Sequence, residues 1–153
     1  MSLKDFAADL LGLHLSDEQI HLFDRYTDEL LAWNSHTNLT AITDPAAVAI
    51  RHHLDSLTVL KAVPIQKGMR VADVGTGGGF PGIPLHLAVE GIYSTLIEST
   101  GKKTAFLKHV ILALGLERIV VINARAEDAG HLAHQRGTYD VVVARAVARL
   151  PIL

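Results

Sequence analysis

The chain has 153 residues, of which 49% are hydrophobic and 20% charged, and its formal net charge is −2 at pH 7. This length suits a single domain with a real core, and this composition argues against intrinsic disorder. The small net charge gives no whole-chain support for nucleic-acid binding, and the absence of cysteine excludes disulfides, thiolate metal sites and a cysteine nucleophile.

Residues 1–66 are predicted to form a helical part. Asp5 and Asp9 interrupt the leucines of the first helix, so neither a signal peptide nor a membrane span is predicted, and a cytoplasmic protein with no membrane partner is expected. Ser16 and Gln19 form a capping box that opens a second helix. The apolar positions of the first helix repeat at helical spacing and are Leu3, Phe6, Ala7, Leu10 and Leu11.

A polar, β-branched segment, 33–43, contains Asn38 and precedes a helix that Asp44 and Pro45 begin. This helix is predicted over 46–54 and continues over 57–63. It carries two pairs of residues four positions apart, Arg51 with Asp55 and His52 with Ser56. Two interpretations stay open: these side chains tie the helix to its neighbours, or they line a cleft that holds a substrate phosphate or base. No metal site is predicted, because the adjacent His52 and His53 point to different sides of a helix.

From residue 67 onward, strand and helix patterns alternate. Strands are predicted over 71–74, 93–98, 119–123 and 139–145, and helices over 83–89, 102–114 and 126–133. Nearly continuous apolar strands separated by helices are typical of a parallel, doubly wound sheet with right-handed crossovers. The sequence therefore predicts a single α/β domain with a Rossmann-like sheet, divided into a helical part, 1–66, and an α/β part, 67–153.

The first strand ends in a glycine-rich turn, DVGTGGGFPG, over 73–82. A dinucleotide fingerprint that starts at Gly75 requires a third glycine where Phe80 stands. Asp73 repels a pyrophosphate and favours a cationic ligand such as S-adenosylmethionine. The pattern from Asp73 through Gly77 to Gly79 resembles motif I of the class I methyltransferases. A purely structural strand-to-helix turn is the alternative.

Polar residues follow the other strands, at the sheet edge where ligands bind in this architecture. Glu98 lies nineteen residues after Gly79, where an acid accepts hydrogen bonds from ribose hydroxyls. Ala126 and Glu127 are candidates for holding an adenine, but Glu127 is also explained as an acid favoured by a helix N-terminus. Arg145 ends the fourth strand and is expected to face a ligand, since burying an unpaired charge is costly.

Several segments together resemble one family, ribosomal RNA small subunit methyltransferase G, also called glucose-inhibited division protein B. The resemblance runs from Trp33 to the last residue. Its N-L-T and R-H-x-x-D-S elements are specific to the family, whereas the glycine turn is shared by many methyltransferases. The segments that carry it are Asn38-Leu39-Thr40, Arg51-His52 with Asp55-Ser56, the turn 73–82, Glu98-Ser99, Arg125-Ala126-Glu127 and Ala144-Arg145-Ala146.

This resemblance implies a bacterial cytoplasmic enzyme that transfers the methyl group of S-adenosylmethionine to N7 of a guanine in 16S ribosomal RNA, leaving S-adenosylhomocysteine. Asp73, Gly75, Gly77 and Phe80 belong to its cofactor turn, and Gly75 and Phe80 border the methionine and ribose end. By position, the ribose is bound by Glu98, Ser99 and Thr100, and the adenine by Ala126 and Glu127. Arg145 lies at the reaction end and is expected to contact the cofactor there. The positions expected to line the RNA-facing side are Asn38, Arg51, His52, Asp55 and Ser56.

The sequence departs from this family in length. Its enzymes usually have a seven-stranded sheet, and here the chain stops just after the fourth strand, so the α/β part is expected to be incomplete. An open sheet edge and an exposed apolar surface after Arg145 predict self-association. Guanine N7 has a free lone pair, so no catalytic base is named, and Arg145 is the candidate catalytic residue. The alternatives are a non-catalytic cofactor- or RNA-binding fragment and a nicotinamide-dependent oxidoreductase, against which Phe80 and Asp73 argue.

Overall fold

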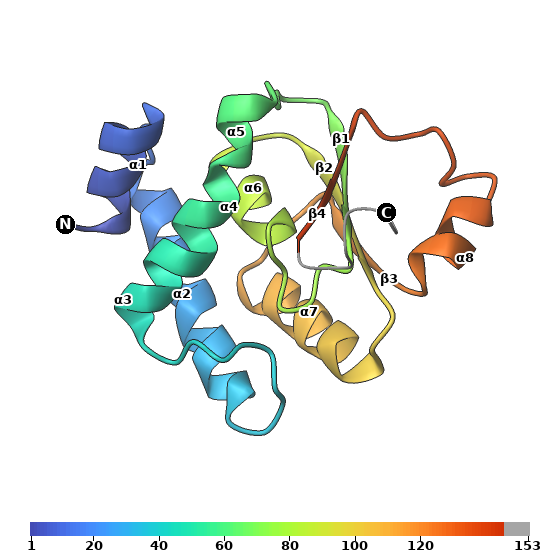
Figure 1. Ribbon diagram of the computed structural model, residues 1–153, viewed down its shortest axis with the longest axis horizontal. Helices are drawn as coiled ribbons and strands as arrows, with labels where there is room; N and C mark the ends of the chain where they lie inside the picture. The colour runs from blue at the N-terminus through green and yellow to red at the C-terminus, as the bar shows by residue number, and fades with distance from the viewer. Residues whose placement is uncertain (146–153) are drawn as a thin grey trace.

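The computed structural model describes residues 1–145, as an open parallel sheet with helices on both faces (Figure 1). Ala146 and the surface expected after Arg145 lie outside the described residues. The elements are α1 (Leu3–Leu11), α2 (Asp17–Asn34), α3 (Pro45–Val48), the π-helix η1 (Ala49–Leu54), α4 (Asp55–Leu57), α5 (Val59–Ala62), β1 (Arg70–Val74), α6 (Gly82–Ala88), β2 (Tyr93–Glu98), α7 (Gly101–Ala113), β3 (Ile119–Asn123), α8 (Ala126–His131) and β4 (Val141–Ala144).

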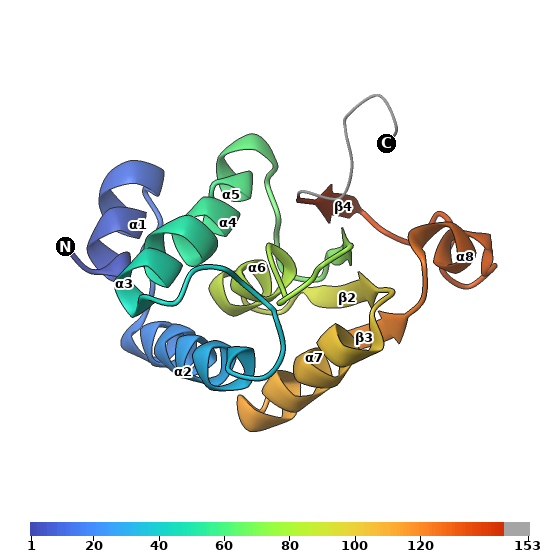
Figure 2. The same ribbon diagram turned by 60° about the horizontal axis from the view of Figure 1, so that its bottom comes forward.

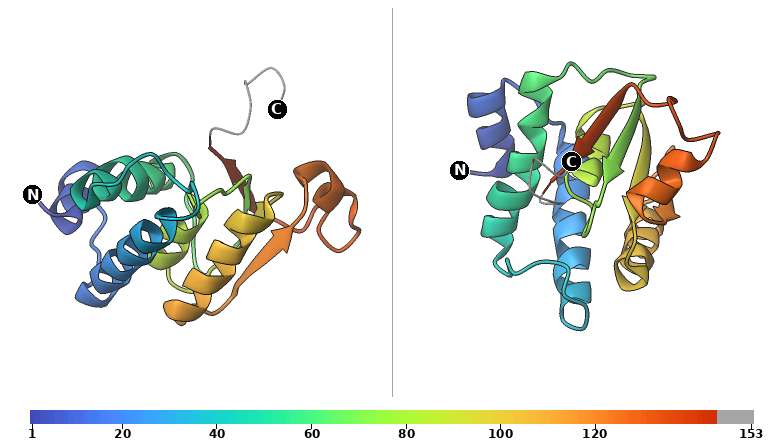
Figure 3. Two further views of the ribbon diagram at one scale, coloured as in Figure 1. Left: turned by 90° about the horizontal axis from the view of Figure 1, so that it is seen from below. Right: turned by 45° about the vertical axis from the view of Figure 1, so that its right-hand side comes forward.

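The four strands are parallel in the order β3-β2-β1-β4. The helices α6 and α7 lie on one face of the sheet with α2 packed beside them, and α8 lies on the other face (Figures 2 and 3). The predicted parallel, doubly wound sheet is confirmed. The bounds of β2 and β3 are as predicted, and those of the other strands and helices of the α/β part differ by at most two residues. The strand order reverses between β1 and β4, so the switch point at which this architecture binds ligands lies at the carboxyl ends of these two strands.

The N-terminal helices pack against the α/β part. Phe23, Tyr26 and Leu30 of α2 are almost fully buried in one core with Ile83 of α6 and Phe106 of α7. The described core therefore joins residues on both sides of the predicted 66/67 boundary. The division into 1–66 and 67–153 stays a prediction.

The run of helices from 45 to 62 departs from the regular helix that the sequence predicted. Between Ala49 and Leu54 the backbone forms a π-helix, and the amide of Asp55 reaches the carbonyl of Ile50, five residues back. A π segment holds one more residue in the turn, and such segments occur frequently at functional sites. It contains Arg51 and His52, so it sets how this motif faces the sheet. No local sequence pattern distinguishes this register from a regular one.

Strands β3 and β4 lie at the two edges of the described sheet and leave apolar side chains open to water. Val142 on β4 is 61% exposed and Val120 on β3 is 56% exposed. Within residues 1–145, none of the helices combines the length and apolar character needed to cross a bilayer.

Candidate functional site

The glycine-rich turn after β1 is tightly packed against α2 and α6. Gly75, Gly77 and Gly79 have positive φ angles of 65°, 59° and 104°. A Cβ atom on Gly79 would lie 2.5 Å from Cδ1 of Ile83 and 2.6 Å from the Tyr26 hydroxyl. That hydroxyl donates a hydrogen bond to the carbonyl of Gly78 at 2.6 Å. The turn therefore depends on glycine and on a buried tyrosine from the N-terminal helices, which the sequence analysis did not identify.

Asp73 lies under this turn with only 1% of its surface exposed. Its Oδ2 accepts hydrogen bonds from the Thr76 hydroxyl at 2.6 Å and from the Gly82 amide at 2.7 Å. Burial raises the pKa of the carboxyl to about 6, although these two hydrogen bonds and Arg145 oppose the shift. Its observed partners are thus groups of the turn itself, and its predicted contact with a cofactor stays a prediction.

Glu98 connects the end of β2 to the same turn. The side chain is 5% exposed, with Oε2 accepting from the Gly77 amide at 2.9 Å and Oε1 from the Thr100 amide at 3.1 Å. A carboxylate oxygen accepts up to two hydrogen bonds, so each oxygen retains acceptor capacity. Gly77, Glu98 and Thr100, which the sequence predicted as site residues, lie together here.

A cavity of about 280 Å³ opens beside Glu98, at the carboxyl ends of β1, β2 and β3. Four predicted site residues, Gly75, Ser99, Ala126 and Glu127, line it. Its other lining residues are Val74, Ile97, Ala124 and Arg125. The three consecutive strand ends therefore converge on one cavity, as the topology predicted. Phe80 and Arg145, also predicted to contact a cofactor, do not line this cavity; they lie together on the other side of the turn.

Phe80 is the centre of that second group, which we call the Arg145 cluster (Thr40, His52, Asp55, Phe80 and Arg145). The ring of His52 stacks on Phe80 with centroids 4.4 Å apart and planes 18° apart. The Arg145 guanidinium carbon lies 5.3 Å from the centroid of the same ring. Stacked aromatic and cation–π contacts of this kind are favourable, and more so when partly removed from water.

Arg145 connects β4 to the π-helix. Its Nη1 donates to Oδ2 of Asp55 at 3.0 Å and to the carbonyl of Arg51 at 3.4 Å, and its Nη2 donates to Nδ1 of His52 at 3.0 Å. Asp55 therefore pairs with Arg145 and not with Arg51, the partner that helical spacing suggested. The side chain of Arg51 is exposed. A cavity of about 390 Å³ adjoins the ion pair, between α4 and β4.

The remaining predicted residues of this region have different surroundings. Asn38 is exposed, whereas the unpredicted Asn34 organises its loop by accepting from the amides of Leu39 and Thr40 and donating to the Thr40 carbonyl. The hydroxyl of Thr40 in turn lies 2.7 Å from Nε2 of His52. Ser56 is buried and donates to the His52 carbonyl at 2.5 Å. Of the predicted RNA-facing residues, His52 and Asp55 thus have side chains in one contact network with Arg145.

Comparison with known proteins shows the family to which the chain belongs. A family profile described as GidB, rRNA small subunit methyltransferase G, matches residues 19–153. The chain belongs to this family. Ribosomal RNA small subunit methyltransferase G of Desulfitobacterium hafniense is 45% identical over 143 residues, which cover 94% of this chain and 59% of that protein. The Pelotomaculum thermopropionicum protein of the same name is 45% identical over 152 residues, covering 99% and 63%. The chain thus spans about three-fifths of the length of these relatives.

Solved structures support the fold of this chain. A variant of MtNAS in complex with S-adenosylmethionine matches with a TM-score of 0.56 at 20% identity, covering 95% of this chain and 51% of that one. A protein-L-isoaspartate O-methyltransferase matches with a TM-score of 0.55 at 16% identity, covering 82% and 47%. At such identities the likeness concerns the fold, and it confirms the Rossmann-like methyltransferase architecture.

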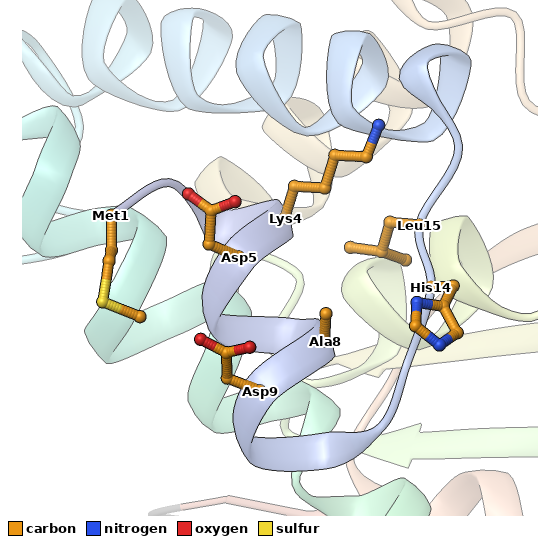
Figure 4. Close-up of a pocket in the computed structure, with 7 residues that line it drawn as sticks. All are labelled: Met1, Lys4, Asp5, Ala8, Asp9, His14 and Leu15. Atoms are coloured by element: carbon orange, nitrogen blue, oxygen red, sulfur yellow. The ribbon is translucent and has the colours of Figure 1, made fainter.

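A further pocket lies outside the segments that carry the family resemblance. It has a volume of about 410 Å³, next to α1, and its lining residues are Met1, Lys4, Asp5, Ala8, Asp9, His14 and Leu15 (Figure 4). Lys4 points to α2, where its ammonium pairs with Asp17 at 2.5 Å, and Asp5 caps the start of α1 through Ser2. These charged groups stabilise helix ends at the surface, so the pocket is not a candidate active site.

Proposed function

We propose that this chain carries the S-adenosylmethionine site of an enzyme that methylates N7 of a guanine in 16S ribosomal RNA. One observation carries the proposal: the cavity at the ends of β1, β2 and β3 and the Arg145 cluster lie on opposite sides of the same glycine turn. A methyl-transfer enzyme needs a cofactor site and a substrate site joined in this way. Membership of the methyltransferase G family supplies the reaction class.

The residues around the cavity suit an adenosine group. Glu98 retains acceptor capacity for ribose hydroxyls, and Ala126 and Glu127 offer a backbone and a carboxylate to an adenine edge. The cavity volume of about 280 Å³ is close to the lower end of ligand pockets, which fits the nucleoside end of the cofactor. When bound, S-adenosylmethionine supplies a sulfonium-activated methyl group.

The protein's own contribution to this reaction is alignment. Guanine N7 already carries a lone pair, so no side chain has to remove a proton before methylation. Orientation of two reactants lowers a barrier by several kcal/mol. Arg145, held by Asp55 and His52 beside Phe80, is placed to hold the guanine O6 or a phosphate, as arginine does in guanine recognition.

A ligand titration tests the cofactor half of the proposal. Calorimetry of the 153-residue chain with S-adenosylhomocysteine, with NADH in a parallel cell, is expected to show binding of the former only. Binding of NADH alone would favour the nicotinamide oxidoreductase that the sequence left open. Absence of both would contradict the cofactor site.

A methylation assay tests the reaction. The chain, labelled S-adenosylmethionine and 16S ribosomal RNA are expected to yield 7-methylguanosine, detected by mass spectrometry after nuclease digestion. RNA carrying 7-deazaguanosine lacks the accepting nitrogen and is the matched control. Cofactor binding without any product would favour the alternative, a non-catalytic cofactor- or RNA-binding fragment. The chain spans about three-fifths of the length of its relatives, which is consistent with this alternative.

The partners follow from the same substrate. We infer that 16S ribosomal RNA or the small ribosomal subunit is bound, and we propose that the protein acts in the cytoplasm. We also infer self-association through β4, because within residues 1–145 this strand lies at the edge of the sheet and exposes Val142, and an open edge strand is a template for pairing. Val142→Lys is expected to reduce association in sedimentation experiments, and an unchanged oligomer would contradict this role of the edge.

A further inference from the structure

His52 has both ring nitrogens committed within the protein. Arginine carries no acceptor, so the 3.0 Å contact between Nη2 of Arg145 and Nδ1 of His52 requires Nδ1 to accept. The proton of the neutral ring is therefore on Nε2, which donates to the Thr40 hydroxyl at 2.7 Å. A ring in this state has no free polar atom for a substrate, which argues against the direct substrate contact that the sequence suggested.

Thr40 is a fixed support for this ring. Its hydroxyl also accepts from the Ile42 amide at 3.0 Å, and its backbone is bonded to the Asn34 side chain through both amide and carbonyl. A threonine hydroxyl has two acceptor positions, and the His52 and Ile42 donors occupy both. The orientation of the His52 ring is therefore set from the loop between α2 and α3.

The Arg145 guanidinium is held from three directions but not saturated. Three of its N–H groups donate to Asp55, the Arg51 carbonyl and His52, and its central carbon lies over the Phe80 ring. A guanidinium has five N–H donors, so two have no acceptor among residues 1–145. Because the other contacts restrict the guanidinium, these two donors have a defined direction.

We propose that His52 is a positioning residue for Arg145: its Nε2-protonated ring, supported by Thr40 and stacked on Phe80, fixes the direction in which Arg145 presents its remaining donors to the RNA. This inference rests on the proposed function, since it assigns the RNA-facing role to Arg145. It assigns Thr40, through His52, to the same task.

The arrangement requires an uncharged His52. Protonation would convert Nδ1 into a donor that faces a donor. The groups that face His52 in the described chain are Arg145 from β4, Asp55 from the following turn, the Thr40 hydroxyl and the neighbouring His53. Burial lowers the pKa of His52 below 6.5, Arg145 lowers it further, and Asp55 opposes them. The turnover number is therefore expected to fall on acidification only below pH 6.5, as His52 protonates.

Substitutions of His52 separate positioning from packing. An asparagine places its oxygen where Nδ1 accepts from Arg145, whereas a glutamine places its amide nearer the Nε2 position and phenylalanine keeps only the stacking. His52→Asn is expected to retain turnover within about tenfold, and His52→Gln and His52→Phe to lose about 10- to 100-fold in kcat, with the KM for S-adenosylmethionine unchanged. Equal loss in all three variants, or none, would overturn the proposal.

The loop gives a second, matched pair. Thr40→Ser keeps the hydroxyl and is expected to keep turnover, while Thr40→Val keeps the shape and is expected to lose part of it. His21→Ala, an exposed histidine on α2, is the control for the loss of any imidazole. Equal turnover of the serine and valine variants would remove Thr40 from the assignment.

A spectroscopic readout decides the inference even if the chain has no turnover. Long-range ¹H–¹⁵N spectra of the full chain are expected to show His52 as the Nε2–H tautomer at neutral pH, with a pKa below 6.5 that rises in Arg145→Met. An Nδ1–H tautomer, or a His52 pKa unchanged by Arg145→Met, would overturn it. Failure of RNA methylation with these spectra intact would instead contradict the proposed function alone.

Discussion

The two sides of the glycine turn are built in different ways. The cavity at the ends of β1, β2 and β3 is lined largely by residues that directly follow three consecutive strands, and the Glu98 carboxylate beside it is bound by backbone amides. The Arg145 cluster consists of side chains from the loop before α3, from the π-helix, from α4, from the turn and from β4. One side therefore depends on chain conformation and the other on the meeting of distant side chains.

This difference determines what each side tolerates. A site made by strand ends and backbone groups persists through most side-chain changes but fails when the backbone is forced to move. When one partner is lost from a site made by hydrogen bonds between distant side chains, the protein keeps its fold, but the remaining side chains lose their fixed orientation. Variants on each side therefore have separable effects on cofactor binding and on turnover.

The largest effect is expected from the backbone side. Gly79→Ala would place a Cβ within 2.6 Å of Tyr26 and Ile83 at a φ of 104°, so the free energy of unfolding is expected to fall by about 3 kcal/mol, with loss of S-adenosylhomocysteine binding. Urea unfolding and calorimetry measure both. Gly101→Ala, with nothing within 4 Å of the new Cβ, is the control. Equal stability of the two variants would contradict the tight turn.

Arg145→Ala tests the side-chain side. Loss of its charge-assisted contacts is expected to lower kcat about 100-fold while cofactor affinity stays within about twofold. Arg136→Ala, at an exposed arginine on the segment between α8 and β4, is the control. A parallel fall in S-adenosylhomocysteine affinity would place Arg145 on the cofactor side, where the sequence analysis had also put it.

His53 is buried next to the Arg145 cluster, against Phe23, Tyr26 and Phe80. Burial lowers its pKa to about 3, so the folded state resists protonation while the unfolded state binds a proton near pH 6.5. Stability from this group is complete above pH 6.5 and falls as the pH decreases towards 3. Between pH 7 and 5 the loss is expected to be about 2 kcal/mol.

His53→Phe is expected to remove this acid dependence in urea unfolding at several pH values. Asp73 acts in the opposite direction, because its raised pKa of about 6 makes the folded state gain a proton as the pH falls from 7. Asp73→Asn should therefore steepen the loss on acidification. An unchanged pH profile in His53→Phe would show that another group dominates.

A smaller effect is expected for Glu98→Gln. The amide retains one acceptor oxygen and loses the charge, so the affinity for S-adenosylhomocysteine should fall about tenfold while the tautomer of His52 stays unchanged. Calorimetry and the ¹H–¹⁵N spectra measure the two quantities. A change at His52 would show that the two sides are coupled through the turn.

The smallest effect is expected for Arg51→Ala. Its side chain is exposed, and Arg145 contacts only its carbonyl, so the free energy of unfolding should change by less than about 0.5 kcal/mol. Asp55→Ala, which removes the partner of Arg145, should cost more. The reverse order would restore the Arg51–Asp55 pair that the sequence suggested.

The backbone side was largely predictable from the sequence. Apolar strands, the glycine turn and the acid nineteen residues after Gly79 have local signatures, and strand ends must converge in a parallel sheet. Gly75, Ser99, Ala126 and Glu127 accordingly line one cavity. Whether they bind a cofactor stays a prediction.

The side-chain side was predictable only in part. Family motifs pointed to His52, Asp55 and Arg145, but their partners depend on contacts across 93 and 90 residues of chain. Helical spacing paired Asp55 with Arg51 because the π register has no local signature. Tyr26 and Asn34 were missed for a different reason: a tyrosine on an apolar helix face and an asparagine at a helix end have ordinary structural explanations.

The π-helix has a consequence for changes in chain length. One residue rotates an α-helix by about 100°, so a residue added to or removed from the helical turns beside 49–54 would rotate His52 relative to its partners by that angle, unless the π turn itself gained or lost its extra residue. The tip of the loop at 35–38, by contrast, lies between Asn34 and Thr40, whose hydrogen bond closes the base of the loop. A residue added at the tip is expected to leave this bond and the His52 ring in place. Changes in chain length are therefore expected to be tolerated in the loop at 35–38 and to be rare in the helical turns around His52.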